Sequence, residues 1–137
     1  MFSIPPAWKK GPEKRVFGLV PVKSTLQVGR DSDSDENSSD GQSLPFSDSM
    51  IDTVPDLVTM AAGALRVLQQ NDSGFFLMIE GGAIDWASHG NNSARMIEEE
   101  IAFNHTVEYI VDWIENNSSW RETLLIVTAD HECGNLS

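Results

Sequence analysis

The stretch FFLMIEGGAIDWASH, residues 75–89, begins with five consecutive apolar side chains and continues into charged and polar ones. An apolar run of this length is too short for a helix, and being apolar on both faces it suits a parallel strand that is covered on both sides. A second run, TLLIVT at residues 123–128, is largely apolar and contains β-branched residues. Between the two runs, residues 93–116 have apolar positions at helical spacing. The sequence therefore predicts a strand, a helix and a second strand.

This order of elements predicts the fold class. A β-α-β crossover is right-handed and joins parallel strands, so the carboxyl ends of both strands lie at one edge of the sheet. Upstream, residues 55–70 predict another helix with Thr53 as a candidate cap, and the runs at 15–20 and 24–28 predict two further strands. We therefore expect an α/β fold, with a partial doubly wound, mostly parallel sheet flanked by helices.

The long helix is expected to be amphipathic. The apolar side chains that share one of its faces are Met96, Phe103, Val107, Ile110, Val111 and Ile114. Three charged residues near its start, Arg95, Glu98 and Glu99, lie off this face. We expect these three side chains to point away from the apolar core.

Composition and charge exclude several classes of protein. The 137 residues, 40% of them apolar, suit about one domain. Nine basic against 21 acidic residues give a net charge of −12, which argues against a nucleic-acid partner. No apolar run approaches the ~20 residues of a membrane span, and the first residues have no apolar core of signal-peptide length. Residues 31–43 form an acidic, serine-rich segment that we expect to be a flexible loop.

Candidate metal ligands follow both predicted strands, where ligands bind in open α/β sheets. The first strand is followed by Glu80, Asp85 and His89, and the second by Asp130 and His131. In a helix, the i, i+4 spacing places Asp85 and His89 on one face, and the Gly-Gly pair before them permits a sharp turn. Mixed imidazole and carboxylate donors suit Zn²⁺ beside a harder ion such as Mg²⁺. A site with two metal ions ~4 Å apart is recurrent in phosphoryl transfer, which becomes the leading reaction class.

Each of these residues also has a structural interpretation. A lone carboxylate at a strand end is commonly a helix cap or a solvated charge. Trp86 is either an aromatic lid over a substrate or a core residue, and a core residue is the default. The single cysteine, Cys133, excludes an internal disulfide and an all-cysteine zinc site. Cys133 could be a soft ligand, but we interpret it as a small buried thiol.

Two segments, GFFLMIEGGAIDWASHGNN (74–92) and LLIVTADHECGNL (124–136), closely resemble the alkaline phosphatase family. Its members have a strand that ends in E-G-G-x-I-D-x-x-x-H and a later strand that ends in T-A-D-H. The resemblance is continuous over residues 55–136 and looser over 15–31. It implies a set of roles, in which Glu80 binds Mg²⁺, Asp85 and His89 bind one Zn²⁺, Asp130 and His131 bind a second Zn²⁺, and Trp86 lies near the bound phosphate.

The resemblance implies a metal-dependent phosphomonoesterase, in which a serine attacks the phosphate monoester. In the family, the nucleophilic serine, a bridging aspartate and a phosphate-binding arginine precede the E-G-G motif, and no equivalent precedes Glu80. The family's last zinc-ligating histidine follows the T-A-D-H motif. We therefore expect residues 1–137 to be a single partial domain of a larger phosphatase, without a catalytic residue of its own and inactive alone.

The resemblance also implies partners and a location. The parent protein would bind phosphate monoesters and inorganic phosphate and would be periplasmic or extracellular. The resemblance is also compatible with a homodimer. One alternative is another hydrolase of the same superfamily, such as a phosphodiesterase or a sulfatase. A second alternative is a non-catalytic remnant that acts as an interaction or dimerisation module.

Overall fold

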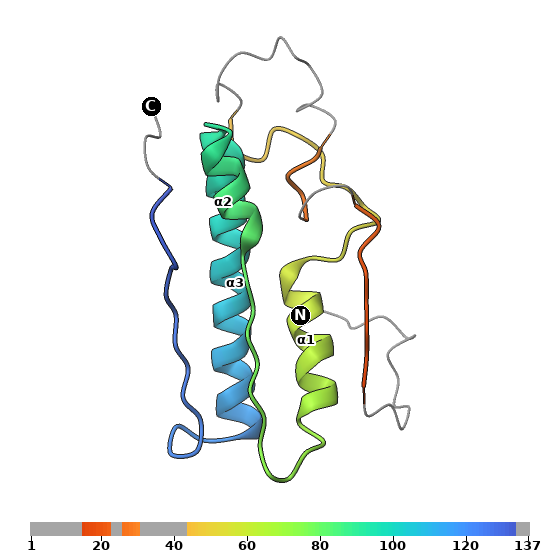
Figure 1. Ribbon diagram of the computed structural model, residues 1–137, viewed down its shortest axis with the longest axis vertical. Coiled ribbons are helices and arrows are strands. Elements are labelled where there is room, and N and C mark those ends of the chain that lie inside the picture. The colour runs from red at the N-terminus through yellow and green to blue at the C-terminus, as the bar shows by residue number, and fades with distance from the viewer. Residues whose placement is uncertain (1–14, 23–25, 31–43, 134–137) are drawn as a thin grey trace.

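Three helices organise the chain. The computed structural model describes residues 15–22, 26–30 and 44–133, and its helices are α1 (Leu57–Leu68), α2 (Gly82–His89) and α3 (Ser93–Asn117). Both shorter helices pack against α3, which spans most of the length of the molecule (Figure 1). None of the described helices combines the length and apolar character that a membrane span requires.

The two longer helices begin at side-chain caps. Asp56 accepts a hydrogen bond from the backbone N–H of Thr59 (2.7 Å) and caps α1, so the prediction of Thr53 as the cap is wrong by three positions. Asn92 accepts one from the backbone N–H of Arg95 (3.0 Å) and caps α3. Both helices predicted from apolar spacing are confirmed. The buried apolar side chains of the described residues come from all three helices and from the residue Val54 before α1: Val54, Leu57, Val58, Ala61, Leu65, Ala83, Ala87, Ala94 and Ile114.

The predicted parallel sheet is wrong for the residues that the structure describes, because none of them lies in a strand. Segments 75–79 and 123–128 run beside α3 as uncoiled stretches (Figure 1). Within the described ranges, no backbone hydrogen bond joins one segment to the other. The upstream strands are also not seen. Residues 15–20 are irregular and residues 26–29 form a turn, while residues 23–25 and the acidic segment 31–43 lie outside the described residues.

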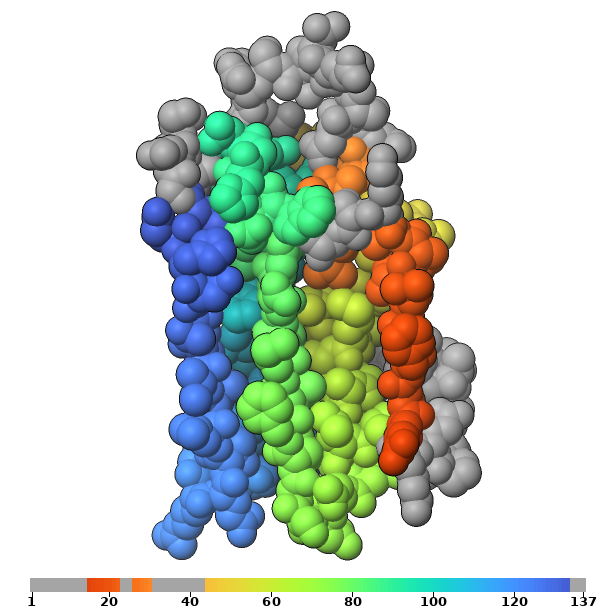
Figure 2. Space-filling model, in the orientation of Figure 1, coloured from red at the N-terminus to blue at the C-terminus, as the bar shows by residue number. Residues whose placement is uncertain are grey.

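The two segments are not strands because an apolar run favours burial but does not supply the backbone hydrogen-bond partner that a strand needs. On one side, segment 75–79 contacts α3, where the Phe75 ring meets that of Trp113 edge to face at 6.0 Å. On the other side, Phe76 is 87% exposed and Leu124 in the second segment is 82% exposed. Figure 2 shows both segments at the surface, in green and blue. Each is therefore covered on one side only, where the pattern predicted cover on both.

A cluster of charged side chains is buried where α3 begins, which contradicts the expectation that they point away from the core. Arg95, Glu98 and Glu99 are each at most 5% exposed, and so is Arg30 from the upstream segment. The Glu98 carboxylate pairs with both guanidinium groups, at 2.7 Å from Nη1 of Arg95, and also accepts the backbone N–H of Phe46 (2.7 Å). We call Arg30, Arg95, Glu98 and Glu99 the buried charge cluster. It attaches residues 26–30 and 44–51 to α3.

Glu99 is the least satisfied member of the buried charge cluster. One of its carboxylate oxygens, Oε1, is buried without a hydrogen-bond partner, as is Nε of Arg95. Burial raises the pKa of Glu99 above its ordinary value, although the positive charges of Arg30 and Arg95 oppose that shift. Burial therefore stabilises the neutral carboxyl of Glu99 relative to its charged form.

Candidate metal centre

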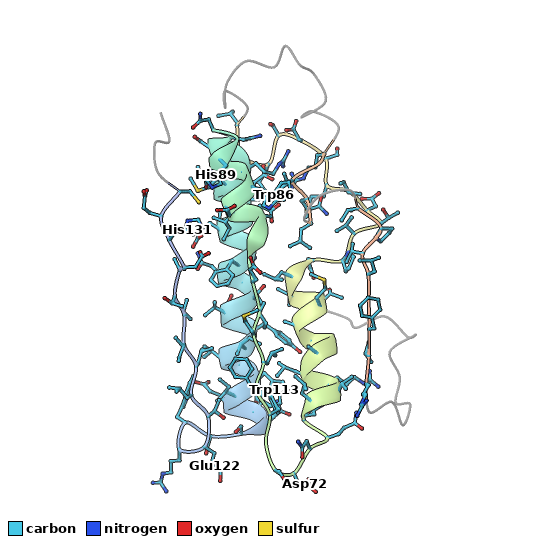
Figure 3. The ribbon with its side chains drawn as sticks, in the orientation of Figure 1. Asp72, Trp86, His89, Trp113, Glu122 and His131 are labelled. Carbon is cyan, nitrogen blue, oxygen red and sulfur yellow. The ribbon has the colours of Figure 1, made fainter. Side chains whose placement is uncertain are left out.

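Ligand-type side chains meet at the end of the molecule where α2 ends. Figure 3 shows His89 at the end of α2 near the segment that carries His131, with Trp86 on the other side of α2, and all three far from Asp72 and Glu122 at the opposite end. Helix α2 begins at Gly82, the second glycine of the pair, and its i, i+4 spacing brings Asp85 and His89 together. The structure brings Asp85, His89 and His131 from the two motifs together, although no sheet edge positions them.

The carboxylate oxygen Oδ1 of Asp85 is the common point of this arrangement. It lies 3.3 Å from Nε2 of His89, 3.8 Å from Nε2 of His131 and 3.1 Å from Sγ of Cys133. Nε2 of His131 also lies 3.4 Å from Oδ2 of Asp130. The imidazole rings of His89 and His131 are 6.5 Å apart, measured between their centres. We call Asp85, His89, His131 and Cys133 the Asp85 group.

Gly81, which precedes α2, packs closely against a side chain of α3. The φ of Gly81 is −86°, which other residues also adopt, so the backbone angle does not explain the glycine. A Cβ atom at this position would lie 3.0 Å from the ring of Phe103 on α3 and 3.1 Å from Ile84. Glycine is therefore needed for the close approach of α2 to α3, and less for the sharp turn that the sequence suggested.

The electrostatics of the Asp85 group follow from these contacts. A hydrogen bond from Nδ1 of His131 to the carbonyl oxygen of Glu132 (3.0 Å) raises the pKa of His131, and the charge of Asp130 adds to that rise. The thiol of Cys133 donates a hydrogen bond to Asp85, which raises the pKa of Cys133. The contact with the carboxylate thus stabilises the thiol relative to the thiolate.

Not every predicted ligand joins the Asp85 group. Glu80 is exposed and stands outside the set of donors that are close enough to share an ion among the described residues. Asp130 contacts His131 but is 89% exposed. Trp86 is 58% exposed, so its default interpretation as a core residue is wrong. The three donors within 4.8 Å of one another are on Asp85, His131 and Cys133.

Cys133 is the member of this set that the sequence interpretation did not select. The side chain is partly buried, and its sulfur faces a carboxylate instead of apolar neighbours. The signal in the sequence was its position two residues after His131. That spacing lets the side chains of an extended segment point to the same side.

Comparison with known proteins places the two motifs in a family. A sequence model described as Alkaline phosphatase matches residues 9–136, nearly the whole chain. The chain belongs to the alkaline phosphatase family. Among alkaline phosphatases, it is 42% identical over 82 residues to the repressible alkaline phosphatase of Saccharomyces cerevisiae, a match that covers 58% of this chain and 14% of that protein. It is 36% identical over 80 residues to the alkaline phosphatase of Escherichia coli, covering 58% of this chain and 16% of that one.

The chain corresponds to a small part of these alkaline phosphatases. A third relative, alkaline phosphatase 4 of Bacillus subtilis, is 38% identical over 80 residues, which is 58% of this chain and 17% of that protein. No solved structure matches the chain significantly. Family membership therefore rests on sequence. The Asp85 group gives a metal-dependent family a set of donors that could hold an ion.

Proposed function

We propose that this chain is the metal-binding portion of a phosphomonoesterase, a protein that hydrolyses phosphate monoesters outside the cytoplasm. The observation that carries the proposal is the meeting of the two motifs at Asp85, where side chains from α2 and from the segment after residue 128 come within 4 Å of one carboxylate oxygen. Two imidazoles, a carboxylate and a thiol are donors that Zn²⁺ prefers in proteins.

The donor set offers a pair of ligands to each of two zinc ions. Asp85 and His89 would hold one Zn²⁺ ion, and Asp130 and His131, 3.4 Å apart, would hold the second. Glu80 would hold Mg²⁺, a role that comes from the family resemblance. When bound, such ions polarise the phosphoryl oxygens of the substrate. Trp86, exposed next to Asp85, would line the place of the phosphate.

The residues of this chain supply binding and orientation. His89 and His131 approach Asp85 Oδ1 from different segments, at 3.3 and 3.8 Å, so donors from both motifs face the same place. The nucleophilic serine of the family has no counterpart in the matched motifs. We therefore expect the chain alone to bind metal without hydrolysing phosphate monoesters.

Metal-dependent stabilisation tests this proposal. At a Zn²⁺ concentration about 100 times the dissociation constant, binding adds about 2.7 kcal/mol to the free energy of unfolding. For a chain of this size that corresponds to a rise in melting temperature of roughly 5–15 °C. Replacing both Asp130 and His131 by alanine should abolish the rise, whereas Asp72→Asn, at the opposite end of the molecule, should keep it (Figure 3). An unchanged melting temperature of the unaltered chain in Zn²⁺ would refute the metal site.

A second candidate function, an interaction or dimerisation module, is supported by a specific observation. Phe76, Met78, Leu124 and Ile126 are 71–87% exposed on the two extended segments. Apolar surface of this kind marks contact with further protein. Sedimentation of the chain over a range of concentrations distinguishes the candidates, because a homodimer on this surface should dissociate when Phe76 and Met78 are both replaced by glutamate. A monomer at all concentrations argues against the module.

A further inference from the structure

Residues 26–30 and 44–51 lie against the start of α3 without fully burying an apolar side chain. The buried residues of these two segments are Gln27 and Arg30, 5% and 4% exposed, and both are polar. The aromatic side chain of Phe46, by contrast, is 62% exposed. The hydrophobic effect therefore contributes less to the attachment of these segments than it does to the packing of the helices. We call residues 26–30 and 44–51 the docked segments.

Charged and polar contacts attach the docked segments to α3. The Glu98 carboxylate pairs with Arg30 from the first segment and accepts the backbone N–H of Phe46 from the second (2.7 Å). Arg95, next to Glu98 on the same face of the helix, lies 3.4 Å from the carboxylate of Asp48. The attachment therefore depends on the charge state of a few buried side chains.

The backbone of the docked segments is strained. Leu26 has a φ of 42° and Phe46 a φ of 65°, in the left-handed region that residues with a Cβ atom rarely adopt. Between the two segments, the side-chain amide of Gln27 bonds to both the N–H and the carbonyl of Ile51 (2.8 and 3.1 Å). These contacts hold a conformation that Leu26 and Phe46 would leave if the segments were released.

Glu99 carries the charge that this arrangement leaves unmatched. Two guanidinium groups, those of Arg30 and Arg95, are paired with two carboxylates, those of Glu98 and Asp48. Glu99 is 5% exposed, and its Oε1 has no hydrogen-bond partner. The charges that act on it are those of Arg30 in the docked segments and of Arg95 and Glu98 on α3, and none of them comes from the described residues of α1 or α2. An ionised Glu99 is therefore a surplus buried charge, which is costly unless water reaches it.

We propose that the docked segments are a latch that opens when Glu99 loses its proton, while the three helices stay folded. Opening admits water to the Glu99 carboxylate and releases the strained backbone. Burial raises the pKa of Glu99 in the closed form above its ordinary value of 4.5, so the closed form binds this proton more tightly than the open form. The closed form should therefore lose stability relative to the open form as the pH rises above that value. The latch goes beyond the proposed function, since none of its residues belongs to the Asp85 group.

Hydrogen exchange of single amides, followed by NMR on the 137-residue chain, tests the latch. The N–H groups of Phe46 and Ile51 donate to the side chains of Glu98 and Gln27, so their protection measures how often the segments are docked. Protection is taken relative to an unfolded peptide at the same pH, which removes the effect of pH on the exchange chemistry. Between about pH 5 and about pH 8, the protection of both amides should fall at least about tenfold. Amides in the middle of α3 should keep theirs.

Two variants identify the group that opens the latch. Glu99→Gln is neutral at every pH, so the amides of Phe46 and Ile51 should keep their protection at about pH 8. Glu100→Gln, at the exposed neighbouring position, should behave like the unaltered chain. The proposal would be overturned by protection that does not change with pH in the unaltered chain, by an equal fall in Glu99→Gln, or by an equal fall throughout α3.

Trypsin provides a second measurement, which does not depend on exchange chemistry. The side chain of Arg30 is 4% exposed, so the protease can cut after it only when the latch is open. At about pH 8, cleavage after Arg30 should be at least about tenfold faster in the unaltered chain than in Glu99→Gln. Arg121, which is exposed, should be cut at the same rate in both proteins. Cleavage after Arg30 that is equally fast or faster in Glu99→Gln would also overturn the proposal.

Discussion

The strongest prediction concerns Glu98, the centre of the buried charge cluster. Its carboxylate, 4% exposed, pairs with Arg30 and Arg95 and accepts the backbone N–H of Phe46. Glu98→Gln keeps the volume but removes the charge and turns an NH₂ donor toward groups that are themselves donors. Two guanidinium groups then remain buried with one acidic neighbour fewer. Removing one partner of a buried pair costs about 3–5 kcal/mol, and we expect a loss of this size here.

Urea unfolding, followed by circular dichroism, measures this loss. With a denaturant slope of about 2 kcal/mol per molar, the midpoint should fall by about 1.5–2.5 M. The matched control is Glu100→Gln, two positions along the same helix, where the side chain is exposed. A surface change of this kind alters stability by less than about 0.5 kcal/mol. Equal midpoints for the two variants would show that the cluster contributes nothing to stability and that its charges are solvated.

Two further predictions concern Glu99 and the cap of α1. Because burial raises the pKa of Glu99 above 4.5, the folded chain holds this proton more tightly than the unfolded chain, and stability should fall as the pH rises above that value. Glu99→Gln should remove this part of the fall, and parallel urea midpoints for both proteins from acid to neutral pH would contradict it. Asp56→Ala should lower stability by about 1 kcal/mol in the same assay, because Thr59 loses its cap. Asp52→Ala, at an exposed position, is its control, and an equal loss there would rule out a capping effect.

Local signals predicted the helices of the fold but not its tertiary arrangement. The period of apolar residues gave α3 to within one residue at its end. The run FFLMI was interpreted as a buried strand because its composition is apolar, yet a strand also needs a backbone partner, and that partner cannot be read from five residues. The buried charge cluster was missed for a related reason. Arg95, Glu98 and Glu99 look like a solvated face until Arg30 and the N–H of Phe46, distant in sequence, are placed against them.

The candidate site was predictable where motif and helix geometry coincide. The i, i+4 spacing alone places His89 beside Asp85, and the position of His131 after the second apolar run singled it out before the resemblance was considered. Which donors share one oxygen depends on how segment 130–133 lies against α2, and no local pattern specifies that. Cys133 was interpreted as a small buried thiol because burial is the commonest state of a single thiol. Its hydrogen bond to Asp85 depends on the tertiary structure and cannot be predicted from the local sequence.

The hydrogen bond from Phe46 to Glu98 has a consequence for the order in which the chain folds. It joins residues 52 positions apart, and closing a loop of that length costs about 3.5 kcal/mol of chain entropy before any contact repays it. By contrast, α2 and α3 are joined by a turn in which the N–H of Asn92 bonds to the carbonyl of Ala87 (2.9 Å), so they can pair at little cost. The α2–α3 hairpin, with Asp85 and His89 already on it, should form early, and residues 44–51 should dock late. Half of the candidate metal centre is then assembled before the rest of the chain is in place.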